Sequence, residues 1–317
     1  MTASKNPPTR GRKGATPTRG PGRARSVALW VGGIVVAAVV ATVLVVGAGG
    51  DGDVPTAADG TPGVAHVHGL GVDPADGALH AATHHGLFRI EDSSSAQLVS
   101  APHDLMGFTV VGAAHFLASG HPSLKSDDLR RDGHPPLLGL IESVDGGETW
   151  EPLSLLGEAD FHSLSAAHGA VYGFNSATGV FMVSNDGEQW HARSQQSMVD
   201  FAVSPGDPDR IVATTAAGLL ESVDGGRSWT PFAAQGPALA FLGWHEERGL
   251  WGLGADGEVH ELVGDAWQAR QRLGGGPQAL LVADDGVYAA VDDGATAIYV
   301  SEDGVTWTPL FRDVTGR

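Results

Sequence analysis

One string occurs four times along the chain and restricts its fold more than any other feature. Residues 142–150 read "ESVDGGETW", and similar letters return as "VSNDGEQW" at 183–190, "ESVDGGRSW" at 221–229 and "VSEDGVTW" at 300–307. The larger unit that contains the string recurs from His66 onward at intervals of 37–57 residues. Internal repeats of this length are typical of solenoids and propellers.

Each unit contains four short apolar segments separated by Gly, Pro and Asp. The six units begin with "HVHGLGV" at 66, "HDLMGFTV" at 103, "DFHSLSA" at 160, "MVDFAVS" at 198, "ALAFLGW" at 238 and "PQALLVA" at 277. Four short strands in each repeat are the pattern of a propeller blade. We therefore expect an all-β fold, a six-bladed β-propeller over residues 65–312.

The recurring string is interpreted as the turn between the third and fourth strands of a blade. Its Asp can accept hydrogen bonds from backbone N–H groups of its own turn, and the Gly that follows tolerates a positive φ. Its Trp can pack between neighbouring blades. A structural role is thus assigned to Asp145, Trp150, Asp186, Trp190, Asp224, Trp229, Asp303 and Trp307.

These strings resemble the Asp-box, S-x-D-x-G-x-x-W, of BNR-repeat propellers, the superfamily that includes sialidases. The strings "HVHGLGVDP", "ATHHGLFRI", "HDLMGF", "ASGHP" and "DFHSL" are similar to those of a bacterial family of membrane-anchored BNR propellers, often labelled glycosylhydrolase-like. The resemblance covers about residues 66–311. It implies the propeller fold and carries no defined activity.

The segments before the repeats have a different composition. Residues 1–25 hold seven basic residues and no acid, and we expect a disordered cytoplasmic tail. Residues 27–48 are uncharged and largely apolar, and we expect a transmembrane signal-anchor helix over residues 26–48. A cleaved signal peptide is the alternative. Residues 49–64 read as a flexible linker. The propeller would then lie outside the bacterial cell membrane.

Charge and cysteine content exclude several classes of function. The chain has 37 acidic and 19 basic residues, which gives a net charge of −18. The basic tail holds none of the acidic residues, so the part of the chain from Asp51 onward is strongly acidic. Such a surface repels phosphate groups, so we expect no nucleic-acid partner. The chain has no Cys, which excludes disulfides, thiolate metal ligands and a Cys nucleophile.

Eleven of the fourteen histidines fall within residues 66–168, the first three units. Inner-strand starts and the loops between second and third strands share one face of a propeller, which predicts a His-rich face on blades one to three. The candidate ligand-binding residues are His66, His68, His84, His103, Asp104, His121, Asp160 and His162. The other three histidines, His191, His245 and His260, are interpreted as ordinary surface or core residues.

Three interpretations of this face remain open. His66, His68, His103 and His162 are candidate ligands of a divalent transition metal, zinc or copper, because imidazole suits these ions. A polar ligand pocket without metal and purely structural hydrogen bonding are the alternatives. His66 and His68 are two residues apart, so on a regular strand both side chains lie on one side.

The chain is not recognisable as a sialidase, because three arginines and a catalytic Tyr cannot be placed on the His-rich face. A glycoside hydrolase that uses two carboxylates is a second hypothesis, with Asp104 and Asp160 as candidates and Asp200 as a third. A non-catalytic scaffold for assembly of a membrane protein complex is the remaining class. In that case the insertion at 121–138, which interrupts the repeat, is a candidate recognition loop for a protein partner.

Overall fold

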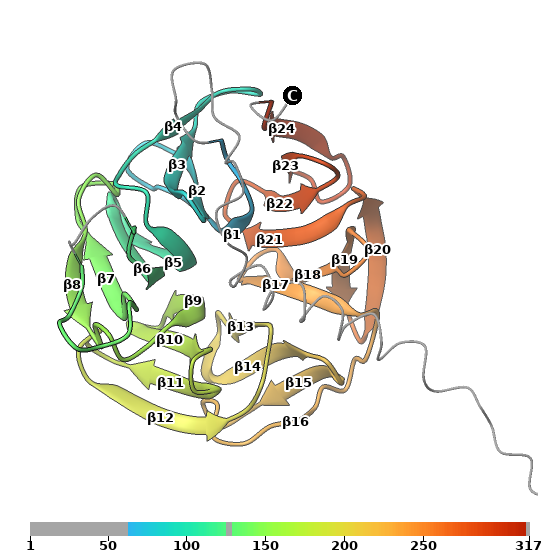
Figure 1. The fold of residues 1–317 in the computed structure, drawn as a ribbon. Helices are drawn as coiled ribbons and strands as arrows, with labels where there is room; N and C mark the ends of the chain where they lie inside the picture. Colours follow the sequence, from blue (N-terminus) through green and yellow to red (C-terminus); the bar gives the residue numbers. More distant parts are fainter. Residues whose placement is uncertain (1–62, 125–128, 315–317) are drawn as a thin grey trace, which may run out of the picture.

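The structure is a computed structural model that describes residues 63–124 and 129–314. Its 24 strands form six four-stranded antiparallel sheets arranged around a ring, which confirms the six-bladed propeller (Figure 1). Across the described residues, no helix is long and apolar enough to span a membrane. The predicted anchor at 26–48 lies outside the described residues.

Each blade uses four consecutive strands. The first two blades contain β1 (Val67–Val72), β2 (Leu79–Thr83), β3 (Gly86–Ile90), β4 (Ala96–Leu98), β5 (Asp104–Gly112), β6 (His115–His121), β7 (Leu140–Ser143) and β8 (Glu151–Ser154). The next two contain β9 (Phe161–Ala167), β10 (Ala170–Asn175), β11 (Val180–Ser184), β12 (Trp190–Gln195), β13 (Asp200–Ser204), β14 (Asp207–Thr215), β15 (Gly218–Ser222) and β16 (Thr230–Pro231). The last two contain β17 (Leu239–His245), β18 (Gly249–Gly254), β19 (Glu258–Val263), β20 (Ala266–Arg272), β21 (Gly276–Val282), β22 (Val287–Asp292), β23 (Thr296–Ser301) and β24 (Thr308–Arg312).

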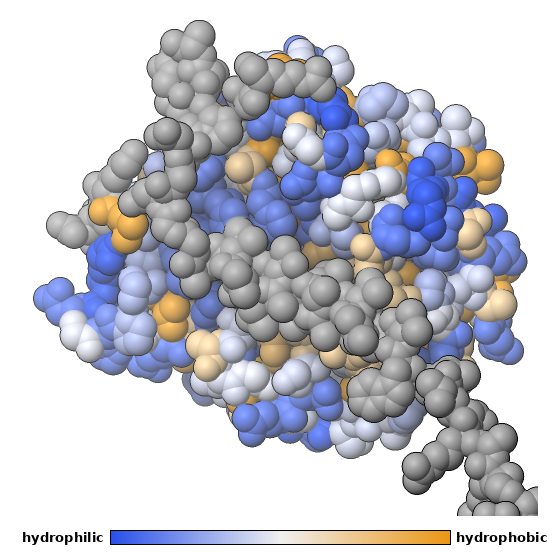
Figure 2. All heavy atoms as spheres, turned by 45° about the vertical axis from the view of Figure 1, so that its right-hand side comes forward, coloured by the Kyte–Doolittle hydropathy of each residue, from blue (hydrophilic) through white to orange (hydrophobic). Residues whose placement is uncertain are grey.

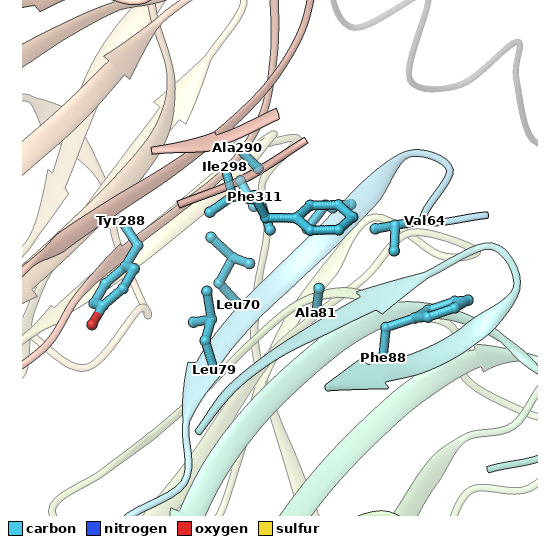
Figure 3. Packing of buried hydrophobic residues seen from close by; sticks show 11 residues of the cluster. Val64, Leu70, Leu79, Ala81, Phe88, Tyr288, Ala290, Ile298 and Phe311 are labelled. Atoms are coloured by element: carbon cyan, nitrogen blue, oxygen red, sulfur yellow. The ribbon is translucent and has the colours of Figure 1, made fainter. Parts of the chain in front are cut away.

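The ring closes without exchange of a strand between the first and last blades. The sheet orders are β1-β2-β3-β4 and β21-β22-β23-β24, so each terminal blade is complete by itself. Leu70 and Leu79 of blade one pack against Ile298 and Phe311 of blade six in a shared hydrophobic cluster (Figure 3). Closure therefore depends on side-chain packing between the two ends of the chain, with one backbone hydrogen bond from the N–H of Arg312 to the carbonyl oxygen of Ser93 at 3.0 Å.

The other five interfaces between blades have the same construction. Each holds one hydrophobic cluster to which two adjacent blades contribute. Between blades three and four, for example, the ring of Phe181 meets Phe201 edge-on at 5.1 Å between centroids. Burying a side chain of this size contributes about 1.5–3 kcal/mol, so each interface adds stability that one blade alone cannot supply.

The recurring turns have the role that the sequence predicts for them. In blade two, Asp145 accepts hydrogen bonds from the N–H of Thr149 at 3.0 Å and from the hydroxyl of Ser143 at 2.8 Å. The indole N–H of Trp229 donates to Ser194 of the preceding blade at 2.9 Å. Trp150 and Trp190 make the equivalent bonds to Ser100 and Ser154. Each of these turns thus connects its blade to the one before it.

Trp307 departs from this pattern. Its indole nitrogen is buried and has no hydrogen-bond partner in the part of the chain that the structure describes. Four residues after the Trp of their own blades, blades two and three place Ser154 and Ser194, whereas blade five places Gln271 at this position. The fourth turn therefore packs its Trp without the hydrogen bond between blades.

This difference predicts unequal effects of one substitution at two equivalent positions. Trp229→Phe should lower the free energy of unfolding by about 0.5–1.5 kcal/mol more than Trp307→Phe, because only Trp229 loses a hydrogen bond. Urea unfolding of both variants and the parent measures the difference. Equal losses at the two positions would contradict this account of the turn.

Candidate functional site

The inner strands of all six blades enclose a central channel with a cavity of about 540 Å³. Most of the residues that line it are apolar or glycine, and His68, His162 and Asp200 are among the polar ones. Figure 2 shows that the described outer surface on one side of the molecule is mainly hydrophilic, with hydrophobic residues in small separate groups. The channel is therefore the concave feature that the ring provides for a ligand.

Bulges in the inner strands set the direction of two histidines. In β1 the register passes from Val67↔Thr83 to Gly69↔Ala82, so His68 is the extra residue of a β-bulge. In β9 the register passes from Phe161↔Asn175 to Ser163↔Phe174, which makes His162 the extra residue. A bulge redirects its side chain relative to the regular alternation of a strand. Both side chains consequently line the channel.

The expectation that His66 and His68 lie on one side of a regular strand is corrected here. His66 precedes β1 and has a φ of 35°, an uncommon conformation for a residue with a side chain, and His68 occupies the bulge. The two rings still meet edge-on, with 4.8 Å between centroids. The two side chains lie together because a left-handed residue is followed by a bulge.

Six of the candidate residues form a continuous chain of contacts across blades one to three. His68 Nε2 lies 3.3 Å from His84 Nδ1, and this same nitrogen lies 2.8 Å from Asp104 Oδ1. The other oxygen of Asp104 lies 3.3 Å from Nδ1 of His121. The chain ends at Asp160 Oδ2, which is 3.7 Å from His121 Nε2 and 2.8 Å from His162 Nε2. We call these six residues the His-Asp chain.

The strand pairing explains how the middle of the chain forms. Asp104, the first residue of β5, is directly opposite His121, the last residue of β6. His84 approaches from the turn between β2 and β3 in the neighbouring blade. Loops between second and third strands and starts of inner strands thus meet on one face, as the sequence predicts.

Burial and hydrogen bonding shift the pKa values of several groups at this site. Burial and the neighbouring His84 lower the pKa of His66 to about 4, and burial with His84 and His66 lowers the pKa of His68 further. Burial acts to raise the pKa of Asp104, but hydrogen bonds with His121 and His84 outweigh it and hold that pKa well below its usual range. The hydrogen bond to Asp104 raises the pKa of His121. A neutral imidazole, that of His68, therefore lies 4.0 Å from the ionised carboxylate of Asp104.

Asp160 is a second ionised carboxylate in the chain. Burial acts to raise its pKa, and the contact with His162 outweighs burial, so that the net shift is downward. Its Oδ2 also accepts a hydrogen bond from Ser176 at 2.8 Å, while the buried Oδ1 has no partner within the described residues. An orphaned buried carboxylate oxygen leaves an acceptor position unused.

His103 does not join the His-Asp chain in the way the sequence predicts. Its ring is buried, and its Nδ1 accepts a hydrogen bond from the backbone N–H of Ser123 at 3.0 Å. This contact fixes the beginning of the insertion at 121–138, of which residues 125–128 lie outside the described part. In the structure His103 thus positions the insertion, and its role as a ligand stays a prediction.

Asp200 occupies a place that its position in the sequence does not reveal. It accepts hydrogen bonds from Ser163 Oγ of blade three at 2.7 Å and from the N–H of Leu242 of blade five at 2.9 Å. The carboxyl therefore connects three inner strands. Burial raises its pKa to about 6, and Asp200 differs in this respect from Asp104 and Asp160.

Comparisons with known proteins identify the fold and nothing finer. No family model matches the chain, and no curated protein matches it. Among solved structures it is similar to the GH74 xyloglucanase from Xanthomonas campestris, at 17% identity and a TM-score of 0.53 over 78% of this chain and 46% of that one. The GH74 enzyme of Niastella koreensis gives 13% identity and the same TM-score, over 78% of this chain and 45% of that one.

A structure of a nidogen/laminin complex is also similar, at 10% identity and a TM-score of 0.53, over 76% of this chain and 99% of that one. The chain spans less than half the length of the two GH74 chains. These similarities support the propeller fold. Identities this low indicate a shared architecture, and one architecture carries many functions.

The raised pKa of Asp200 predicts a pH dependence of stability. The folded state holds this proton up to about pH 6 and the unfolded chain releases it near pH 4, so the folded state loses stability as pH rises between these values. Asp200→Asn should remove that loss, so the stability of the parent relative to the variant falls by about 3 kcal/mol from pH 4 to pH 7. Urea unfolding at several pH values tests this, and a difference independent of pH would contradict it.

Proposed function

We propose that the propeller binds a divalent transition metal ion, zinc or copper, through His68, His84 and Asp104. The observation that supports this most is the convergence of three ligand-type atoms on one point. His84 Nδ1 lies 3.3 Å from His68 Nε2 and 2.8 Å from Asp104 Oδ1, and the latter two atoms are 4.0 Å apart. One proton on His84 Nδ1 satisfies a single partner, whereas a cation satisfies all three atoms.

The spacing of these atoms suits a tetrahedral ion. Zinc bound at its usual distances to nitrogen and oxygen separates neighbouring ligand atoms by about 3.3 Å. The three observed separations lie on both sides of that value, so small side-chain rotations are enough. Three protein ligands leave one position for water or a substrate, and His68 lines the channel from which such a ligand would arrive.

Protonation favours binding at this position. A metal requires neutral imidazole and ionised carboxylate, and burial already keeps His68 neutral while Asp104 is ionised. His66, whose ring stacks on that of His84 with 5.4 Å between centroids, is a further nitrogen donor beside these residues. Nδ1 of His66 lies 3.5 Å from the side-chain nitrogen of Gln278 in blade six, which orients this ring. His162 would act through Asp160 and His121, at the far end of the His-Asp chain.

The same carboxylates give little support for a glycoside hydrolase. Such enzymes need one carboxyl that stays protonated and serves as the acid, yet both Asp104 and Asp160 have lowered pKa values. The third candidate, Asp200, has a pKa raised to about 6, but both of its oxygens accept hydrogen bonds within the protein, from Ser163 and from the N–H of Leu242. The similarity to GH74 enzymes concerns the fold alone. We therefore rank metal binding first and keep a non-catalytic scaffold as the conclusion that would follow if no metal binds.

We also propose that the chain belongs to the membrane-anchored BNR propellers that it resembles, with its N-terminus in the cytoplasm. The support is the stretch of 22 uncharged residues at 27–48 with a basic flank before it, together with the four turns that carry Asp and Trp. The propeller would then bind its ligand, a metal ion with or without a glycan or protein partner, outside the cell.

Metal binding is tested by titration of the purified full-length chain, expressed without a His tag, with Zn²⁺ and Cu²⁺ at pH 7. We expect calorimetry to detect one ion per chain, at micromolar concentration or tighter, whose binding depends on His68 and His84. The double variant His68→Ala and His84→Ala should bind at least about 100-fold more weakly, because two of the three ligands are gone.

His191→Ala is the matched control, since His191 is exposed on β12 and lies outside the His-Asp chain. This control should bind like the parent. Undiminished binding in the double variant would exclude the proposed ligands. A double variant that unfolds when metal-free would support the structural hydrogen-bonding interpretation instead.

Topology is tested with single cysteines, because the chain has none of its own. Ser94→Cys places a thiol in the exposed turn before β4, and Ser4→Cys places one in the basic tail. A membrane-impermeant maleimide applied to intact cells should label the first and spare the second until lysis. Labelling of neither in intact cells, or release of the chain from the membrane after cleavage, would contradict the anchored arrangement.

A further inference from the structure

A second group of ligand-type residues lies in blade five, across the ring from the His-Asp chain (Figure 1). Asp256 is in the turn between β18 and β19, Glu258 is the first residue of β19, and His260 is two residues further on the same strand. Glu258 and His260 therefore point to the same side of β19. One potential ligand atom of each residue lies within 4.8 Å of those of the other two.

His260 has no partner that accounts for its position. The residue is only 6% exposed, and its Nε2 is buried without a hydrogen-bond partner among the described residues. This nitrogen lies 3.6 Å from Glu258 Oε2, beyond hydrogen-bonding distance. Burial lowers the pKa of His260 and keeps the ring neutral, which leaves a lone pair available. A buried imidazole that faces a carboxylate without a hydrogen bond indicates a place for a bound ion between them.

Gly254 leaves space beside these residues for an ion, because it has no side chain. A Cβ at this residue would be 2.8 Å from Asp256 Oδ1, 3.1 Å from the carbonyl oxygen of Glu258 and 3.6 Å from His260 Nε2. Gly254 is absent from the residues with positive φ, so its backbone does not require glycine. Three electron-rich atoms thus surround a point that any other residue type would fill.

Arg272 of β20 currently balances the negative charge. Its Nη2 lies 2.6 Å from Asp256 Oδ2 and 3.8 Å from Glu258 Oε2, while Oδ1 of Asp256 faces the space over Gly254. The side chain of Arg272 is 56% exposed, so it can withdraw into solvent at low cost. Arg272 therefore competes with a cation for the two carboxylates.

We propose that Asp256, Glu258 and His260 form a second cation site, independent of the first, that takes a divalent ion of the Mn²⁺ class. Carboxylate and carbonyl oxygens suit Mn²⁺, and a single imidazole is compatible with it, whereas the first site is richer in nitrogen and suits zinc or copper. The two sites share the face on which second-to-third strand loops lie, in blades one to two and in blade five.

The test is an electron paramagnetic resonance titration of the full-length chain with Mn²⁺ in the His68→Ala and His84→Ala background, so that failure of the first site does not affect the result. One Mn²⁺ should bind per chain. His260→Gln and Gly254→Ala should each weaken binding roughly tenfold or more, the first by loss of a ligand and the second by filling the space.

Arg272→Gln gives the discriminating result. It removes a competing cation from an exposed position, so the fold should persist. The affinity for Mn²⁺ should rise several-fold, as expected from the small free energy of a surface ion pair. Weaker or unchanged binding in Arg272→Gln, no bound Mn²⁺ in the parent, or full binding in His260→Gln would each overturn the proposal.

Discussion

Packing between neighbouring blades is the interaction on which the rest of the molecule depends. Every blade is a four-stranded sheet with two faces to bury, and the six clusters bury them only if the ring closes. The closing cluster of blades one and six joins the two ends of the folded chain by side-chain packing (Figure 3), and no strand crosses between the two blades. Closure brings Gln278 of blade six against His66 of blade one, so the candidate site is completed by the last blade as well as the first three.

The architecture was readable from the sequence because it repeats. Four similar turns mark four of the six blades, and in each of them Asp accepts hydrogen bonds within the turn while Trp packs between blades. The position of the His-rich face was also readable, because strand order alone decides which loops meet. Asp104 opposite His121 follows from this reasoning.

The details of the site were not readable, for identifiable reasons. Regular alternation predicts where a strand residue points, but His68 and His162 are extra residues of bulges, and no letter in the sequence marks a bulge. His103 is a histidine like the other candidates, but its ring accepts a hydrogen bond from the backbone N–H of Ser123. The sequence does not single out His260, because Gly254 and Asp256 come close to it only when the β18–β19 turn is folded.

The central claim is that His68, His84 and Asp104 hold one metal ion. The most direct measurement is a pair of anomalous diffraction data sets from crystals soaked in zinc, collected above and below the zinc absorption edge. The account predicts a peak present only above the edge, about 2.0–2.2 Å from His68 Nε2, His84 Nδ1 and Asp104 Oδ1. No peak between these atoms, in crystals that have taken up zinc elsewhere, would contradict it.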